Sequence, residues 1–145
     1  MTLEYHPVCV DDAAPLAALR VAAMRPSLEA VGRFDPTRAR QRFLDKFVPQ
    51  ATTKLVSNGQ LIGFYVLIEE PDHFWLDHLY LLPAFQGHGY GQQVVARIKA
   101  LARARQFSIH LCALRDSPAN GFYQQQGFQL RYEEEWDLYY QWLGD

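Results

Sequence analysis

The apolar and polar residues near the start of the chain predict a strand followed by a helix. The segment from Leu3 to Val8 is a short opening strand in this interpretation. Asp11 or Asp12 then suits the cap of a helix, because a short acidic side chain accepts hydrogen bonds from the first free amides. The apolar residues of this helix fall on one face at helical spacing: Leu16, Leu19 and Ala23.

A second helix is predicted between Asp35 and Pro49. Asp35 suits the N-cap, and Pro36 suits the first helical position because its ring fixes φ at a helical value. Phe43 and Phe47 are spaced i and i+4, so they share one face of the helix. Pro49 marks the end of the helix.

The middle of the chain has the pattern of an antiparallel meander. Residues 54–57 and 60–69 are predicted strands, joined by Asn58-Gly59, a pair that tolerates the positive φ values of a tight hairpin turn. A second turn at residues 71–72 leads into residues 74–82, which are rich in aromatic and branched side chains. We therefore expect three consecutive antiparallel strands.

The hydrophobic period changes from that of a strand to that of a helix after residue 91. Residues 92–105 form an amphipathic helix whose apolar stripe is Val94, Ile98, Leu101 and Ala102. Residues 107–114 form another apolar strand, a short helix follows over 116–127, and two strands around 128–132 and 136–142 close the chain. The fold class is therefore α/β (α+β), a mixed sheet flanked by helices.

The composition fits one globular domain over residues 1–145. Of the 145 residues, 49% are hydrophobic and 21% are charged, and no linker or repeat divides the chain. The longest apolar runs are far below the roughly 18 to 20 residues that cross a bilayer, so we expect no membrane segment. Acids near the start occupy the place where a signal peptide needs basic residues, so we expect a cytoplasmic protein.

Cysteine and histidine usage predicts neither a disulfide nor a metal site. Cys9 and Cys112 lie far apart, each in an apolar strand-like stretch, so we expect both to be reduced core residues. The five histidines show no paired ligand spacing. We therefore predict no metal.

The charge of the chain is unevenly distributed. The net charge of −2 argues against nucleic-acid binding. Residues 78–115 contain five basic residues and no acid, so this stretch carries +5 and the rest of the chain carries −7. Two interpretations stay open: an anion lies near this stretch, or Lys99 and Arg103 belong to a solvated helix face.

A glycine-rich segment separates the strand that precedes it from the helix that follows it. Gly87, Gly89 and Gly91 would let backbone amides converge on a pyrophosphate at the positive end of the helix. The segment is not a P-loop, because the Gly-Lys-Ser/Thr ending is missing. It is not a dinucleotide fingerprint either, because Gln92 stands where the last glycine belongs. A glycine-rich turn without a ligand remains the alternative.

At this point the sequence resembles the GCN5-related N-acetyltransferase (GNAT) superfamily. Its phosphate loop, Gln/Arg-x-x-Gly-x-Gly/Ala, is matched by Gln86, Gly89 and Gly91. A later family motif is matched except at its first position, where an aspartate replaces asparagine: Asp116, Ala119, Phe122, Tyr123, Gly127 and Phe128. The resemblance covers nearly the whole chain. It implies a GNAT fold, with a mostly antiparallel sheet of about seven strands, splayed in the middle, and about four helices.

The resemblance also implies how acetyl-coenzyme A (acetyl-CoA) would be bound. The backbone of three strand residues would pair with the pantetheine arm: Leu79, Tyr80 and Leu81. Seven residues would wrap the pyrophosphate: Gln86, Gly87, His88, Gly89, Tyr90, Gly91 and Gln92. The family asparagine that usually contacts the cofactor is Asp116 here, which cannot donate a hydrogen bond as a carboxylate. Asp116 is either a cofactor contact or only a helix N-cap, and Asn120 is a candidate source of the missing amide.

Two proton transfers are required when an amine attacks a thioester. Tyr123 fits the acid that protonates the departing thiolate, because a phenol with a pKa of about 10 is neutral at pH 7. A packed aromatic is the alternative interpretation of this residue. The candidate bases are Asp77, at a position where related enzymes often carry a carboxylate, and His78, whose residue type titrates at about pH 6.5. Neighbouring strand residues point to opposite faces, so only one of the two faces the acceptor.

The predicted function is transfer of an acetyl group from acetyl-CoA to a primary amine by direct attack in a ternary complex. A non-catalytic acyl-CoA binding or sensor module is the alternative. The acceptor, a small-molecule or peptide amine, is not identified, although residues 24–35 between the two N-terminal helices are expected to help form its pocket. The aromatic segment 136–142 either lines that pocket, packs in the core or forms a homodimer surface. We expect no nucleic-acid or membrane partner.

Overall fold

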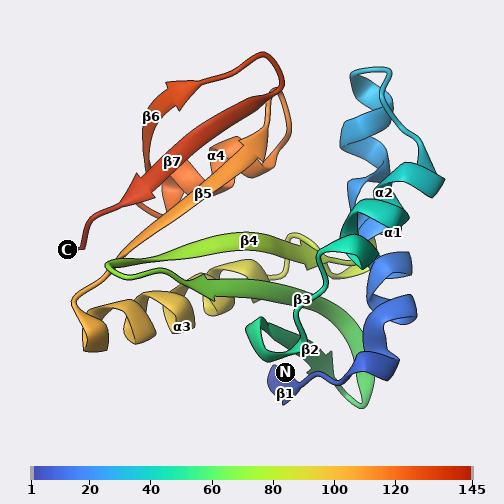
Figure 1. Cartoon of the computed structure of the whole chain (residues 1–145), viewed down its shortest axis with the longest axis horizontal. Coiled ribbons are helices and arrows are strands. Elements are labelled where there is room, and N and C mark those ends of the chain that lie inside the picture. Colours follow the sequence, from blue (N-terminus) through green and yellow to red (C-terminus); the bar gives the residue numbers. More distant parts are fainter. Residues whose placement is uncertain (1, 145) are drawn as a thin grey trace. The chain divides into compact units, whose positions relative to one another are not determined.

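The computed structural model describes residues 2–144, which form a seven-stranded mixed sheet with four α-helices (Figure 1). The strands are β1 (Glu4–Pro7), β2 (Thr52–Ser57), β3 (Gln60–Glu69), β4 (His73–Leu81), β5 (Ser108–Leu114), β6 (Gln129–Glu133) and β7 (Asp137–Trp142). The α-helices are α1 (Ala13–Ala30), α2 (Pro36–Asp45), α3 (Tyr90–Arg105) and α4 (Ala119–Gln125). Three short 3-10 helices are η1 (Val10–Asp12), η2 (Pro49–Ala51) and η3 (Pro83–Phe85).

The order of strands across the sheet is β1-β2-β3-β4-β5-β7-β6. The pairs β1–β2, β2–β3, β5–β7 and β6–β7 are antiparallel, whereas β4 pairs with β5 in parallel. This confirms the predicted α/β class with a mostly antiparallel sheet of seven strands and four helices.

The chain divides into two compact units, each built from two separate stretches of sequence. The first unit contains the residues up to Val66 together with His78–Tyr90, and the second contains Leu67–Asp77 together with the residues from Gly91 onward. A single domain over residues 1–145 therefore stays a prediction, and each unit is described by itself below.

The core of the first unit lies between helices α1 and α2 and strands β2 and β3. Asp35 caps α2 as predicted, because its carboxylate accepts a hydrogen bond from the amide of Arg38 at 3.1 Å. Phe43 of α2 is buried and packs edge-on against Phe64 of β3, with ring centroids 5.2 Å apart. Gly63 of β3 is required by close packing, because a Cβ there would lie 2.2 Å from the carbonyl oxygen of Tyr80.

The first helix is longer than the sequence indicates. It continues through Pro26 to Ala30, so the first half of the predicted connection at 24–35 is helical. The helix ends at Ala30, and Gly32, just after its C-cap Val31, has a φ of +69°. The amides of Gly32 and Arg33 donate to the carbonyls of Glu29 and Leu28, a Schellman pattern that satisfies the last free carbonyls. The glycine is therefore the stop signal of this helix.

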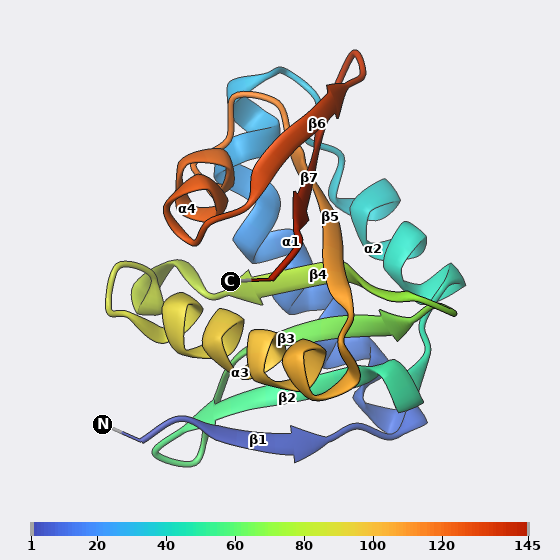
Figure 2. The same cartoon turned by 90° about the vertical axis from the view of Figure 1, so that its left-hand side faces the viewer.

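The second unit buries one face of its strands against helices. Figure 2 shows α4 on one side of strands β5, β6 and β7. Alternate residues of β5 are buried, Ile109, Leu111 and Ala113, as are Tyr140 and Trp142 of β7. The buried residues of α3 that follow its N-terminus are Val94, Val95, Ile98 and Ala102. Leu101, predicted to join the apolar stripe, is 42% exposed. Val95 is buried instead, so the buried face of α3 is centred on Val94, Val95, Ile98 and Ala102.

Both cysteines are free, as expected, but neither is a core residue. Cys9 lies just after β1 and is exposed. Cys112 is exposed because it alternates with the buried residues of β5 and so falls on the opposite face of the strand. The apolar character of a segment therefore predicted a strand correctly but not which face each residue occupies.

Four of the five basic residues of the stretch have partners within the second unit. Lys99 donates to the carbonyl of Gln126 and lies over the ring of Trp142 at 5.3 Å, as does the guanidinium of Arg103. Arg105 pairs with Glu69, and Arg115 pairs with Glu133 at 2.9 Å. Lys99 and Arg103 therefore contact Trp142 rather than forming a purely solvated helix face, and an anion near this stretch stays a prediction.

Residues 2–144 were compared with the predictions that the chain has no membrane segment and no metal site. None of the helices there is long and apolar enough to cross a membrane. No group of three or more His, Cys, Asp or Glu side chains in this part of the chain is arranged to hold a metal ion. The absence of a metal stays a prediction.

Candidate functional site

The glycine-rich loop of the first unit is exposed and leads directly into a helix. After β4 and the 3-10 turn η3, Gly87 and Gly89 adopt left-handed φ values of +76° and +85°. Nothing lies within 4 Å of a Cβ built on either glycine. Helix α3 begins at the next residue, Tyr90. Left-handed glycines before the first free amides of a helix are the backbone arrangement that binds a phosphate oxygen.

Two side chains of this loop hold its shape. The Gln86 amide donates to the carbonyl oxygen of Leu81 at 3.0 Å, which occupies one of the backbone groups predicted to pair with the pantetheine arm. Tyr90 is 2% exposed, and its hydroxyl lies 3.3 Å from that of Ser57. The Tyr90 ring is therefore a core group, and only its backbone remains available to a ligand. His88 is exposed, as are Gly87 and Gly89.

A polar cluster surrounds the hydroxyl of Tyr80 on β4. His78 Nδ1 lies 2.8 Å from this hydroxyl, and Nε of Arg20 on α1 donates to it at 3.3 Å. The hydroxyl in turn donates to the sulfur of Met24 at 3.3 Å. Phe43 packs edge-on against the His78 ring at 5.7 Å. Helix α1 thus contributes two side chains to the surroundings of a predicted base, and no pattern in the sequence pointed to either.

The hydrogen bonds of this cluster can all be formed with one tautomer of His78. The Tyr80 hydroxyl has one hydrogen and two lone pairs. Arg20 is only a donor and the Met24 sulfur is only an acceptor. All groups are satisfied when the hydroxyl donates to Met24 and accepts from Arg20 and from Nδ1–H of His78. In this arrangement Nδ1 of a neutral His78 carries the hydrogen.

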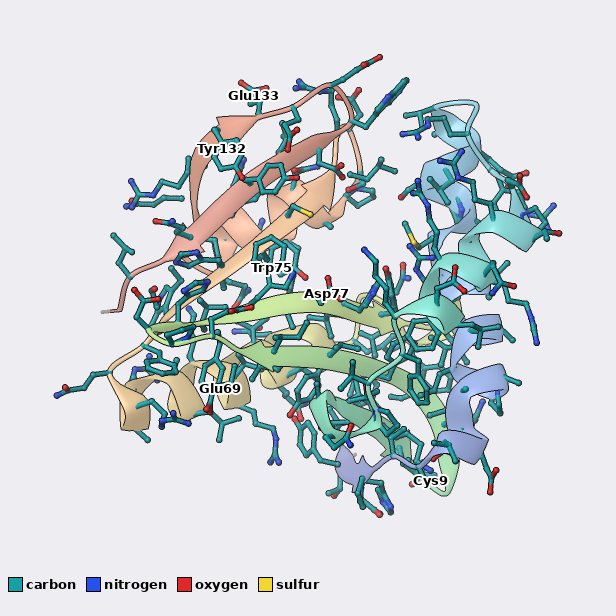
Figure 3. The ribbon with its side chains drawn as sticks, in the orientation of Figure 1. Cys9, Glu69, Trp75, Asp77, Tyr132 and Glu133 are labelled. Atoms are coloured by element: carbon teal, nitrogen blue, oxygen red, sulfur yellow. The ribbon has the colours of Figure 1, made fainter. Side chains whose placement is uncertain are left out.

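Asp77, the other candidate base, is placed in the second unit beside Trp75. The indole Nε1 of Trp75 donates to Asp77 Oδ1 at 3.0 Å, and both side chains leave β4 in the same direction (Figure 3). Asp77 and His78 therefore have different neighbours, and their projection to opposite faces stays a prediction.

Cys112 of β5 lies in a negative environment within the same unit. Partial burial of the thiol, followed by the charges of Asp137, Asp77 and Glu134, raises the pKa of Cys112 to about 11. The thiol is therefore protonated at neutral pH, and a protonated thiol is a poor nucleophile. Cys112 is unsuited to carry an acyl group.

Helix α4 carries Tyr123, the predicted general acid. Tyr123 is 7% exposed, and its ring packs edge-on against Phe122 and Phe128 with centroids 5.2 and 5.5 Å away. These two rings fix the orientation of the phenol. Its role as an acid stays a prediction.

The structure corrects the suggestion that Asp116 caps this helix. The N-cap of α4 is Pro118, with no side-chain cap, and Asp116 adopts a left-handed φ of +67°. The turn is held instead by Asn120, whose amide nitrogen donates to the carbonyls of Leu114 and Ser117 at 2.9 and 3.0 Å. Asn120 Oδ1 also accepts from the Tyr140 hydroxyl at 2.9 Å. A cofactor contact from the Asn120 amide would require one of its present bonds to break.

Sequence reasoning missed the aromatic side chains that gather on the second unit. The rings of Tyr132 and Tyr139 are stacked, with centroids 4.3 Å apart, and Trp75 lies 6.5 Å from Tyr139. The spacing of aromatics in 136–142 suggested a pocket, but only the strand pairing shows that residues of β4 and β6 join them.

Comparisons with known proteins agree with this geometry. Residues 51–130, more than half of the chain, match the family model described as an acetyltransferase (GNAT) domain. The search of curated proteins finds no match.

Solved structures resemble the whole chain at low sequence identity. PaiA N-acetyltransferase from Thermoplasma acidophilum, crystallised in complex with coenzyme A, is 15% identical with a TM-score of 0.81, covering 97% of this chain and 98% of its own. An acetyltransferase from Thermus thermophilus is 23% identical with a TM-score of 0.74, at 98% and 97% coverage. Apo YjaB from Escherichia coli is 18% identical with a TM-score of 0.75, and both chains are covered completely.

Proposed function

The chain belongs to the GNAT acetyltransferase family, whose enzymes use acetyl-CoA to acetylate amines, and from this premise we propose that it acetylates a primary amine by direct attack on the thioester. The observation that carries this proposal is the exposed loop with left-handed Gly87 and Gly89 at the start of α3. No covalent acyl-enzyme is formed in this proposal, because the one cysteine on the strands of the second unit is held protonated.

The loop residues fit the pyrophosphate of acetyl-CoA. The open space beside Gly87 and Gly89 leaves their amides accessible, and the first turn of α3 adds Gly91 and Gln92. Backbone groups of residues 79–81 would bind the pantetheine arm. The Leu81 carbonyl is the exception, because it already accepts a hydrogen bond from Gln86. Acetyl-CoA supplies the activated acetyl group, and the protein supplies the proton transfers.

The proposed reaction moves two protons off the acceptor nitrogen. His78 accepts the first at Nε2, which leaves a neutral amine whose lone pair attacks the thioester carbon. Collapse of the tetrahedral adduct breaks the carbon–sulfur bond, and the electron pair leaves with sulfur. Tyr123 donates its hydroxyl proton to this sulfur and recovers a proton from the nitrogen. The products are the N-acetylamine, free coenzyme A and one proton on His78.

Two observations support His78 over Asp77 as the base. His78 Nδ1 lies 2.8 Å from the Tyr80 hydroxyl, in a cluster that orients the imidazole, and an imidazole is the side chain that ordinarily titrates nearest to neutral pH. Asp77 accepts a hydrogen bond from Trp75. In this proposal Asp77 orients Trp75 rather than removing a proton.

Substitutions of the acid and the two candidate bases test these roles. Tyr123→Phe removes the proton donor but keeps the ring, so we expect kcat to fall about 100-fold or more with little change in the KM for acetyl-CoA. His78→Gln should lower kcat/KM and flatten its decrease toward acidic pH, whereas Asp77→Asn should retain that decrease. Steady-state rates from pH 5.5 to 9 measure all three.

The opposite pattern would overturn the assignment of the base. That pattern is loss of the decrease in activity toward acidic pH in Asp77→Asn and its retention in His78→Gln. Full kcat for Tyr123→Phe at every pH would remove the general acid from the mechanism.

A further inference from the structure

The hydroxyl of Tyr80 joins helix α1 to the imidazole of the proposed base. It lies 2.8 Å from Nδ1 of His78, which stands two residues earlier on β4. It accepts a hydrogen bond from Nε of Arg20 at 3.3 Å and donates one to the sulfur of Met24 at 3.3 Å. All four residues belong to the first unit, so these contacts lie within one compact part of the chain.

The local periods of the two elements bring these side chains together. Residues i and i+2 of a strand project from the same face, so Tyr80 lies beside His78 on one face of β4. Residues i and i+4 of a helix are neighbours, so Arg20 and Met24 form one patch on α1. The Tyr80 hydroxyl is therefore the point at which a helix face contacts the strand face that carries the proposed base.

Aromatic rings also contact the His78 imidazole. Phe43 of α2 packs edge-on against it at 5.7 Å, and Phe64 of β3 lies 6.5 Å away. Ring packing limits where the imidazole lies, but it does not distinguish Nδ1 from Cδ2, which exchange places when the ring turns over about its Cβ–Cγ bond. A hydrogen bond makes that distinction, and the one to the Tyr80 hydroxyl is formed by Nδ1.

Arg20 is itself held in place by a second hydrogen bond. Its Nη1 donates to the backbone carbonyl of Ala39, a buried residue of α2. One guanidinium thus bonds to the main chain of α2 and to Tyr80 of β4, and neither of these bonds is an ion pair. A planar guanidinium presents its donors in fixed directions, so its attachment to α2 also fixes the direction from which it meets the Tyr80 hydroxyl.

We propose that Tyr80 and Arg20 are positioning residues for the acetyl transfer and act through His78. The inference rests on the proposed function, in which His78 is the base. The Tyr80 hydroxyl holds the imidazole in one of its two ring orientations, and Arg20 holds the hydroxyl. Neither side chain exchanges a proton with the acceptor. A base whose orientation is preset by a bonded neighbour spends less time in unproductive arrangements, so the reaction is faster.

Tyr80→Phe tests the hydroxyl alone, because the substitution keeps the ring that packs against Phe64 at 5.5 Å. With 1,4-diaminobutane as the amine, we expect kcat to fall about tenfold. The KM for acetyl-CoA should stay within about twofold of the wild-type value, since only backbone groups of residue 80 are proposed to bind the cofactor. Unchanged kcat, or a rise in this KM without a fall in kcat, would overturn the proposal.

Thr52→Val is the matched control. Thr52 is a buried residue of the same unit, and its hydroxyl donates to the carbonyl of Val48 at 2.8 Å. The variant therefore also loses one hydroxyl hydrogen bond, but one outside the cluster around Tyr80. We expect its kcat to equal the wild-type value. An equal fall in kcat for both variants would attribute the effect of Tyr80→Phe to a general loss of stability and would overturn its positioning role.

A double-mutant cycle tests whether Tyr80 acts through His78. In His78→Gln there is no imidazole to orient, so adding Tyr80→Phe should leave the remaining kcat unchanged within about twofold. A further loss of about tenfold in the double variant would show that Tyr80 acts independently of His78, and it would overturn the proposal.

Two substitutions test Arg20. Arg20→Met removes both hydrogen bonds of the guanidinium, and its loss of kcat should not add to that of Tyr80→Phe, because both changes act on the same orientation of His78. Arg20→Lys keeps one donor and should retain more of the kcat than Arg20→Met. Circular dichroism checks that each variant is folded. Full kcat in Arg20→Met, or losses that add to that of Tyr80→Phe, would overturn the role of Arg20.

Failure of the proposed function has a different signature. If no amine releases thiol, or if His78→Gln keeps full kcat, the enzymatic proposal or its base fails, and nitrogen NMR of the His78 imidazole then tests the contact alone. At pH 8 we expect the Nδ1–H tautomer to dominate in the wild-type protein and a mixture of tautomers in Tyr80→Phe. The same mixture in both proteins would show that the hydroxyl does not orient the imidazole.

Discussion

At the scale of single residues, the pKa of Cys112 depends on the negative charges of the second unit. Its thiol is partly buried, and Asp137, Asp77 and Glu134 add negative charge around it. Both effects disfavour the thiolate, and together they raise the pKa of Cys112 to about 11. The reactivity of this sulfur therefore reports the negative charge around β5.

Alkylation of Cys112 checks this property directly. In a Cys9→Ser background, the rate with iodoacetamide should rise with pH up to about 11, since only the thiolate reacts. At pH 8 we expect the reaction to be slower than that of a free thiol by on the order of a hundredfold. Asp137→Asn removes a negative charge, so it should lower the pKa and speed the reaction at pH 8. Glu69→Gln should not change the rate, and a half-point near that of a free thiol would refute the negative field around Cys112.

At the scale of elements, the loop between β4 and α3 is the structure on which the cofactor proposal depends. Its two left-handed glycines and the start of α3 follow one another within four residues, Gly87 to Tyr90. An added side chain would meet no protein atom at Gly87 or Gly89, so the empty space is available to a ligand. The hairpin glycine Gly59 has the same properties, with a φ of +75° and open space, but no helix follows it.

This similarity provides a matched pair of variants. Gly89→Glu and Gly59→Glu impose comparable backbone strain at exposed positions, which we expect to cost each variant about 1 kcal/mol of stability. Only Gly89→Glu should abolish the calorimetric binding of acetyl-CoA, because its side chain would occupy the phosphate position with a negative charge. Wild-type affinity in folded Gly89→Glu would exclude the loop as the phosphate site, and equal losses in both variants would attribute the effect to strain.

Elements with strong local signals were predicted well. Helix α2 was recognised from Asp35 and Pro36, and the β2–β3 hairpin from Asn58-Gly59, because these residues act through the backbone conformation of their immediate neighbours. The end of α1 was not, because residues 24–35 were assigned to a connection, whereas the helix continues through Pro26 to Ala30 and is terminated at Gly32.

At the scale of the whole molecule, family membership and fold were accessible from two motifs, while the surroundings of the candidate site were not. The glycine loop and the motif around Tyr123 are each one continuous stretch of residues, so both can be recognised in a single sequence. The contacts of Arg20 and Met24 with Tyr80, and the row of Cys112, Tyr139 and Tyr132, join residues that are distant in sequence. Such groupings depend on strand register and helix placement, which periodicity does not specify.

Direct reaction between acetyl-CoA and an amine on this protein can be tested in one kinetic experiment. Initial rates of thiol release are measured over a matrix of acetyl-CoA and 1,4-diaminobutane concentrations, with mass spectrometry of the products and of the protein. We predict intersecting double-reciprocal lines, one N-acetylamine formed for each thiol released, and no acetyl group on Cys112. Parallel lines with an acetylated cysteine, or saturable binding of acetyl-CoA without thiol release, would show that the amine does not attack the thioester directly.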